Sequence, residues 1–178
     1  MKKFLMIAAL VAAPAAMADL SYQYFDVSYS RMEDVTGFSS NEPGLFLSKS
    51  LADQVQFRFG YSTFDVADFI TFGLGYNKPI SDATDFVLTV DTVRVSVPGA
   101  ELPYTNLGLG VRSAVSDSVE LEGSVIYGVG LFGNDAASDT FGVAAGARFN
   151  FSEQMALGFG YKTFDDIDSM SLSFRFNF

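Results

Sequence analysis

The chain has 178 residues, with 11 basic and 21 acidic side chains and a formal net charge of −10. It contains no cysteine and no histidine. An acidic chain is a poor candidate for nucleic-acid binding, because phosphate contacts need a basic surface. The lack of cysteine excludes a disulfide framework. The lack of histidine removes the usual metal ligand and the usual base that activates a nucleophile, so we expect neither a cofactor nor catalytic activity.

The first 18 residues have the three parts of a secretory signal peptide. Lys2 and Lys3 are positive, residues 4–13 are apolar, and small residues lead to Ala18. Cleavage is expected after Ala18, with export through the Sec route. Residues 19–178 then form a single domain, which contains nine basic and 21 acidic side chains.

The rest of the chain alternates apolar and polar residues, the period of β-strands with one apolar face. The pattern is found in ten segments: 20–30, 44–51, 55–62, 70–77, 86–91, 105–112, 119–129, 141–149, 155–162 and 169–178. In the first, Tyr22 and Tyr24 share one phase, whereas Phe25, Val27 and Tyr29 share the other. We therefore expect a bulge near Tyr24. Eight strands are the alternative if two weak segments fold outside the membrane.

The connections between these segments are of two kinds. Four are short turns of an apolar residue, a small residue and an acid, at 51–53, 80–82, 115–117 and 151–153. Five are less regular and richer in acids, at 31–43, 63–68, 96–103, 131–139 and 163–168. Because the two kinds alternate, we predict an even number of strands with both chain ends on the same side.

One hairpin is repeated within the chain. The sequence Gly-Tyr-Ser-Thr-Phe-Asp at 60–65 returns as Gly-Tyr-Lys-Thr-Phe-Asp at 160–165. The aromatic and polar phases remain in step through Asn77 and Asn177. This match indicates that a hairpin was duplicated.

The composition of the polar phase separates a membrane barrel from a soluble sandwich. A sandwich would place Lys, Glu and Thr on its water-facing side, whereas here glycine, serine and alanine dominate. Small residues suit the inside of a barrel, and large apolar residues suit the surface that faces lipid. We predict an all-β fold, a transmembrane antiparallel up-and-down β-barrel of ten strands. The expected location is the outer membrane of a Gram-negative bacterium, with Tyr61, Tyr76, Tyr127 and Tyr161 in the aromatic girdles.

The last segment has one wholly apolar face that ends on the terminal residue. That face consists of Met170, Leu172, Phe174, Phe176 and Phe178. It resembles the signal that the barrel-assembly machinery of the outer membrane reads. The resemblance implies that this machinery is a partner, besides outer-membrane lipid and lipopolysaccharide.

Short segments across the chain also carry a family resemblance. They are residues 20–24, 74–77 and 109–114, together with the closing strand. With them the chain resembles the superfamily of small OmpA-type and OmpX-type barrels. It is most similar to the xanthomonad outer-membrane proteins named for activation of Xa-twenty-one immunity. The resemblance implies a small exported barrel and brings no catalytic residues with it.

Eight charged residues fall in the polar phase and should therefore face the barrel lumen. They are Arg58, Asp91, Arg112, Glu120, Glu122, Arg148, Lys162 and Arg175. Buried charges need partners, so we predict a network of ion pairs. The network is either a gate or selectivity filter in a narrow pore or a polar core that only stabilises the barrel. Glu120 and Glu122 also form a carboxylate pair of the kind that supports hydrolysis, but the sequence indicates no cleft beside them.

The acidic connections allow further interpretations. Their carboxylates could share divalent cations with lipopolysaccharide, and residues 165–168 could hold a weak Ca²⁺. These residues lack the glycine turn and the bidentate glutamate of a calcium loop, so a solvated surface is favoured. Two functions follow. The first is a structural or narrow-pore barrel, and the alternative is a surface interaction or adhesion protein that acts through its acidic loops.

Overall fold

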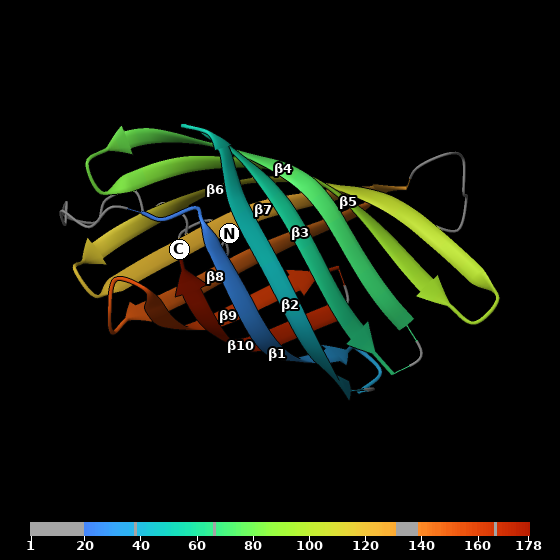
Figure 1. Ribbon diagram of the computed structural model, residues 1–178. Helices are drawn as coiled ribbons and strands as arrows, with labels where there is room; N and C mark the ends of the chain where they lie inside the picture. The colour runs from blue at the N-terminus through green and yellow to red at the C-terminus, as the bar shows by residue number, and fades with distance from the viewer. Residues whose placement is uncertain (1–19, 38, 66, 131–138, 166) are drawn as a thin grey trace.

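The computed structural model describes residues 20–37, 39–65, 67–130, 139–165 and 167–178. The expected signal peptide and most of the connection at 131–139 lie outside these residues. The described chain forms ten strands that close into one antiparallel barrel (Figure 1). The strands are β1 (Tyr24–Asp34), β2 (Ser39–Ala52), β3 (Val55–Phe64), β4 (Ala67–Ser81), β5 (Thr84–Val97), β6 (Ala100–Ser116), β7 (Val119–Gly130), β8 (Thr140–Asn150), β9 (Met155–Phe164) and β10 (Ile167–Asn177). The prediction of ten strands, rather than eight, is confirmed.

The barrel closes between its first and last strands. β1 pairs with β10 along its whole length, from Tyr24 opposite Asn177 to Asp34 opposite Ile167. Every other strand pairs with its neighbours in sequence. The four short turns lie at the same end of the barrel as residue 20 and Phe178 (Figure 1). We call this the terminal end and the opposite one the loop end. Among the described residues, no helix is long and apolar enough to cross a membrane.

The two faces of the sheet have the opposite polarity to those of a soluble protein. Large apolar side chains cover the outside, with Phe72, Phe159 and Met170 exposed by 51%, 63% and 67%. Buried side chains are mostly polar or charged, and the largest fully buried one is Gln56. Such an apolar exterior around a polar interior is the arrangement of a transmembrane barrel, in which closure also pairs every strand edge.

The expected bulge near Tyr24 is wrong. The register of β1 is continuous against both β10 and β2, so Tyr24 and Asp26 point into the barrel and Phe25 points outward. The register shifts lie instead beside three turns at the terminal end, at Ser50/Ala52, Pro79/Ser81 and Ala114/Ser116.

Most of the expected acidic loops are wrong as well. β1 continues to Asp34 and β2 begins at Ser39, so most of the segment 31–43 is strand. The connections expected at 63–68, 96–103 and 163–168 shrink to two residues each, at 65–66, 98–99 and 165–166. Most of the described acidic side chains there belong to strands that extend to the loop end, whereas Asp65 and Asp165 lie at hairpin tips.

The sequence repeat is also a structural repeat. Asp65 and Asp165 adopt the same left-handed backbone, with φ of 43° and 41°, at the tips of the β3–β4 and β9–β10 hairpins. In each hairpin a tyrosine hydroxyl donates to an aspartate seven residues later, Tyr61 to Asp68 at 3.0 Å and Tyr161 to Asp168 at 2.7 Å. Both tyrosines are exposed on the outside near the loop end, which suits their predicted place in a girdle.

Candidate functional site

A layer of charged side chains crosses the lumen toward the terminal end. The strand period turns one charge or more from each of five strands inward, and we call this group the lumenal ion cluster. Its members are Asp26 on β1, Arg112 on β6, Glu120 and Glu122 on β7, Arg148 on β8 and Arg175 on β10. Three positive charges face three negative ones, so the cluster is balanced. All of these side chains are 4–12% exposed except that of Glu122, which is 49% exposed.

The first pair of the cluster crosses the seam of the barrel. Arg175 donates two hydrogen bonds to Asp26, each 2.7 Å long, and the two residues are direct neighbours in the register. The guanidinium of Arg175 also lies 3.2 Å from the centre of the Tyr24 ring. A bidentate pair of this kind fixes the geometry of both partners.

The second pair joins the strands on either side of a turn. Arg112 donates to Glu120 through Nε at 3.0 Å and Nη2 at 2.6 Å. The other Glu120 oxygen accepts from Asn150 at 2.9 Å. Arg112 also donates to the backbone oxygen of Ser21 at 2.6 Å, so the segment before β1 is attached to the cluster.

Arg148 connects the two pairs but is held more loosely than either. Its guanidinium lies 3.7 Å from Glu120, 3.9 Å from Glu122 and 3.9 Å from Asp26. These distances are too long for hydrogen bonds, and Nε has no partner in the described part of the chain. Since Asp26 is three strands away from Arg148 around the barrel, this contact reaches across the lumen.

A separate pair lies on the other side of the lumen. Arg58 on β3 donates to Asp91 on β5 through Nε at 2.9 Å and Nη2 at 3.2 Å. It reaches across β4 because Gly73 has no side chain there, and a Cβ on Gly73 would lie 2.0 Å from Asp91 Oδ1. Arg58 also covers the ring of Phe46, which stacks on Tyr24. Aromatic contacts therefore connect this pair to the lumenal ion cluster.

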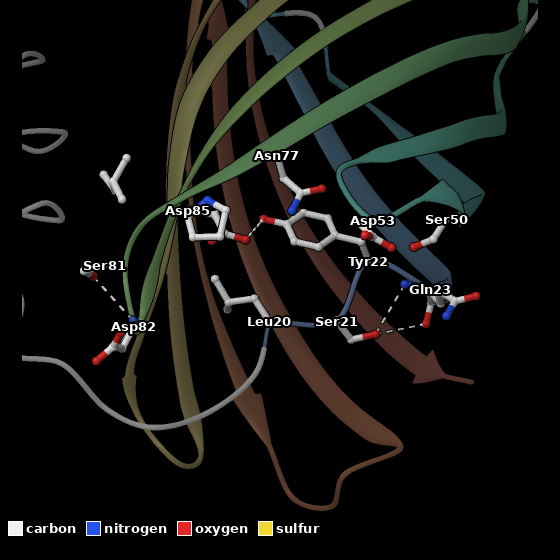
Figure 2. A pocket seen from close by; sticks show the side chains of 13 residues that line it. Leu20, Ser21, Tyr22, Gln23, Ser50, Asp53, Asn77, Ser81, Asp82 and Asp85 are labelled. Atoms are coloured by element: carbon white, nitrogen blue, oxygen red, sulfur yellow. Dashed lines mark hydrogen bonds between the residues drawn. The ribbon is translucent and has the colours of Figure 1, made fainter.

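The segment before β1 folds into the barrel mouth at the terminal end. Figure 2 shows Tyr22 directed toward Asp85, and its hydroxyl donates to that carboxylate at 2.8 Å. Ser48 donates to the Tyr22 backbone oxygen at 2.8 Å, and Arg112 lies over the Tyr22 ring. Burial raises the pKa of Tyr22 well above its ordinary value, so the phenol stays protonated as a donor. An open pocket of 760 Å³ lies around this segment, outside the ion cluster.

The predicted lumenal charges divide into three groups. Five of them belong to the lumenal ion cluster: Arg112, Glu120, Glu122, Arg148 and Arg175. Arg58 and Asp91 form the separate pair. Lys162 faces the lumen nearer the loop end, where its ammonium lies over the Phe164 ring, and it has no ion pair among the described residues. The acid pair of Glu120 and Glu122 is tied to arginines. Within the described residues, no group of acids could hold a metal ion, and Asp166 of the considered calcium segment lies outside them.

Sequence reasoning missed Asp26, Tyr22 and Tyr24. Asp26 would have been found if the regular phase of Phe25, Val27 and Tyr29 had been followed without a bulge. Tyr22 lies before the first strand, where no periodicity places it.

The apolar face of β10 lies on the outside of the barrel, as the alternation predicts. All five residues of the proposed assembly signal are exposed, and Phe178 itself is 54% exposed. Its backbone N–H donates to the oxygen of Gln23 at 3.2 Å, which extends the pairing of the seam by one bond.

The arrangement leaves water access on both sides of the lumenal ion cluster. Toward the loop end, Glu122 and Lys162 face inward yet are exposed. At the terminal end, the open pocket reaches Tyr22 and Asp85. Between these regions, the side chains of the cluster other than Glu122 are almost fully buried.

Comparison with solved structures supports the barrel fold, whereas comparison by sequence finds no match. No protein-family model matches the chain, and no curated protein matches its sequence. Among solved structures, the NanC porin is similar with a TM-score of 0.60 and 9% identity, covering 86% of this chain and 100% of the other. The KdgM porin in complex with disordered oligogalacturonate is similar with a TM-score of 0.56 and 8% identity, covering 87% and 99%. The chain therefore has the fold of outer-membrane β-barrel porins.

Proposed function

We propose that the protein is a non-catalytic outer-membrane barrel with a porin-like role, a narrow pore whose lumen is closed by ion pairs. One observation carries the proposal: side chains on both sides of the lumenal ion cluster are accessible to water, whereas those of the cluster other than Glu122 are almost fully buried. A barrel with a purely structural role needs no open lumen on either side. Charged side chains that cross a pore are also a known means of gating and selectivity.

The weakest connection in the layer supports gating over a rigid core. Arg112 and Arg175 each hold a carboxylate through two hydrogen bonds, whereas the contacts of Arg148 with acids among the described residues are 3.7–3.9 Å long. Moving Arg148 therefore breaks no hydrogen bond to a described residue. Since Arg148 contacts Asp26 across the lumen, its displacement would open a path between the two water-accessible regions.

The apolar exterior of the barrel bears on its location in the cell. The apolar exterior and the fold shared with the NanC and KdgM porins support residence in the outer membrane of a Gram-negative bacterium. Export through the Sec route, cleavage after Ala18 and recognition of the last strand by the barrel-assembly machinery complete this proposal. Lipid and lipopolysaccharide would surround the barrel. A family relationship to the OmpA-type and OmpX-type barrels and to the xanthomonad proteins rests on short segments and also stays a proposal.

The adhesion alternative has less support. Three of the five connections at the loop end consist of two residues, so they present little surface to a partner. The acids expected in long loops lie mostly on strands or at hairpin tips.

Planar-bilayer conductance of the refolded barrel tests the pore. Arg148→Gln should raise the conductance or the open probability, because the cross-lumen contact is lost. The double variant Arg148→Gln/Glu122→Gln keeps the cluster balanced and should conduct as well. Arg94→Gln, in an exposed pair on the outside, is the matched control and should behave as the wild type. If the wild type and both lumenal variants are silent although folded, the barrel is structural only.

A further inference from the structure

One wall of the lumen between the ion cluster and the loop end consists of small side chains. In the register, Ser28 lies opposite Ser173 and Ser30 opposite Ser171 across the seam. Ser171 in turn lies opposite Gly160 on β9. We call the hydroxyls of Ser28, Ser30, Ser169, Ser171 and Ser173 the serine wall. No bulky side chain from β1 or β10 fills the lumen at this height.

The hydroxyls of the serine wall are free to bind. All five serines are partly exposed, and none has a hydrogen-bond partner in the described part of the chain. Two other inward hydroxyls differ in this respect, since Ser48 donates to the Tyr22 backbone oxygen and Ser62 donates to Glu42. A row of unpaired hydroxyls beside accessible lumen offers donors and acceptors in equal measure.

At the cluster end of the serine wall, Arg148 adds a donor that lacks an acceptor. The Arg148 side chain is only 8% exposed, yet its Nε has no partner among the described residues. A Cβ built on Gly158 would lie 2.6 Å from Ser173 Oγ and 3.6 Å from Arg148 Nε. The missing side chain at position 158 thus lets the free Ser173 hydroxyl lie against the backbone of β9, close to an unused guanidinium N–H of Arg148. A buried donor without a partner is costly unless water or a ligand supplies the acceptor.

The charges around the wall favour a neutral ligand. The lumenal ion cluster is balanced, and toward the loop end Lys162 and Glu42 add one charge of each sign. Neither an anion nor a cation meets a net opposite charge from these side chains, and the other acid in the inward phase of β1, Asp34, lies at the end of the strand, where it accepts from Thr36. We propose that the serine wall and Arg148 form a binding site for a small, neutral, polyhydroxylated solute of the sugar or polyol class. This site rests on the proposed pore, for which it would be the solute subsite.

Saturation-transfer NMR with sucrose tests the site without requiring conduction. The barrel is refolded in a zwitterionic detergent that has no sugar head group, since such a head group would compete. Wild type should show saturable transfer to sucrose. In Ser30→Ala/Ser171→Ala/Ser173→Ala the affinity should fall at least about tenfold, since each lost hydrogen bond weakens binding several-fold. The control Ser116→Ala, at the end of β6 beside a turn at the terminal end, should bind as the wild type does.

Other outcomes reject the proposal. Absence of saturable transfer from the wild type to sucrose, or equal binding by the triple variant, would show that the serine wall is not a site. Binding of glucuronate at least about tenfold tighter than glucose would overturn the neutral class, because a net attraction for anions must then exist. Heat-modifiable migration on a gel verifies that each variant is folded. Conductance without sucrose binding rejects the site alone, whereas binding by a silent barrel rejects the pore and retains the site.

Discussion

Asp26 and Arg175 are 149 residues apart in the chain but directly opposite each other across the seam of the barrel. Their two hydrogen bonds of 2.7 Å lie inside the lumen, where Arg175 is 4% exposed. The first and last strands are thus joined by side chains as well as by backbone pairing. This pair couples closure of the barrel to the lumenal ion cluster.

Breaking the seam pair should destabilise the barrel strongly. Asp26→Asn leaves a buried guanidinium without its counter-charge, and we expect a loss of about 3–5 kcal/mol in the free energy of unfolding. Arg94→Gln on the outside breaks an exposed pair with Glu101 and should cost about 0–1 kcal/mol. Urea unfolding in lipid vesicles, followed by heat-modifiable migration, measures both. Equal effects of the two substitutions would mean that the seam pair contributes no more than a surface pair.

Gly73 should be far less tolerant of a methyl group than Gly160. A Cβ on Gly73 would meet Asp91 Oδ1 at 2.0 Å and the backbone oxygen of Val90 at 2.5 Å. On Gly160 it would meet only the Ser171 side chain, whose hydroxyl can rotate away. Gly73→Ala should therefore cost about 1–3 kcal/mol and weaken the Arg58–Asp91 pair, while Gly160→Ala should be close to neutral. The same unfolding assay measures both variants. Comparable losses of stability in the two would contradict the close approach of Asp91 to the backbone of β4.

Removing the Tyr22 ring should open the mouth at the terminal end. The ring lies between Asp85 and Arg112, so Tyr22→Ala should expose the buried Asn77 beside it. Because the chain has no cysteine, Asn77→Cys gives a single thiol whose labelling rate by a polar maleimide reports access. We expect faster labelling in Tyr22→Ala, and no change in Tyr22→Phe, which keeps the ring. An unchanged rate in Tyr22→Ala would show that the segment before β1 does not restrict the mouth.

Phe178 should matter for assembly in cells more than for the stability of the finished barrel. Its side chain is 54% exposed, so its removal leaves no cavity. Phe178→Ala should lower the amount of folded protein in the outer membrane, whereas refolding in vitro should be unchanged. Phe149→Ala, with a similarly exposed ring on β8, serves as the control. If both variants reach the membrane equally well, the last strand is not read through its terminal residue.

The fold was predictable because it depends on a period, and the site was less so because it depends on distances across the lumen. Large apolar residues in one phase and glycine or serine in the other define strands and faces. Tyr24 suggested a bulge, because a large aromatic residue in the polar phase breaks that pattern, although its ring packs against Arg175 inside the barrel. The contact of Arg148 with Asp26 depends on the width and tilt of the whole barrel. No local pattern encodes those quantities.

The two matching hairpins, β3–β4 and β9–β10, have a consequence for how such a chain can evolve. Each carries its own tip, with Asp65 or Asp165 in the left-handed region and a tyrosine tied to an aspartate on the adjacent strand. A unit that brings its own turn and pairs only with its neighbours can be copied or deleted without redesign of the remaining strands. The circumference then changes in steps of two strands, and both chain ends stay on the same side of the membrane. Barrel width in this architecture is therefore open to change by duplication of a hairpin such as β3–β4, which contributes no side chain to the lumenal ion cluster.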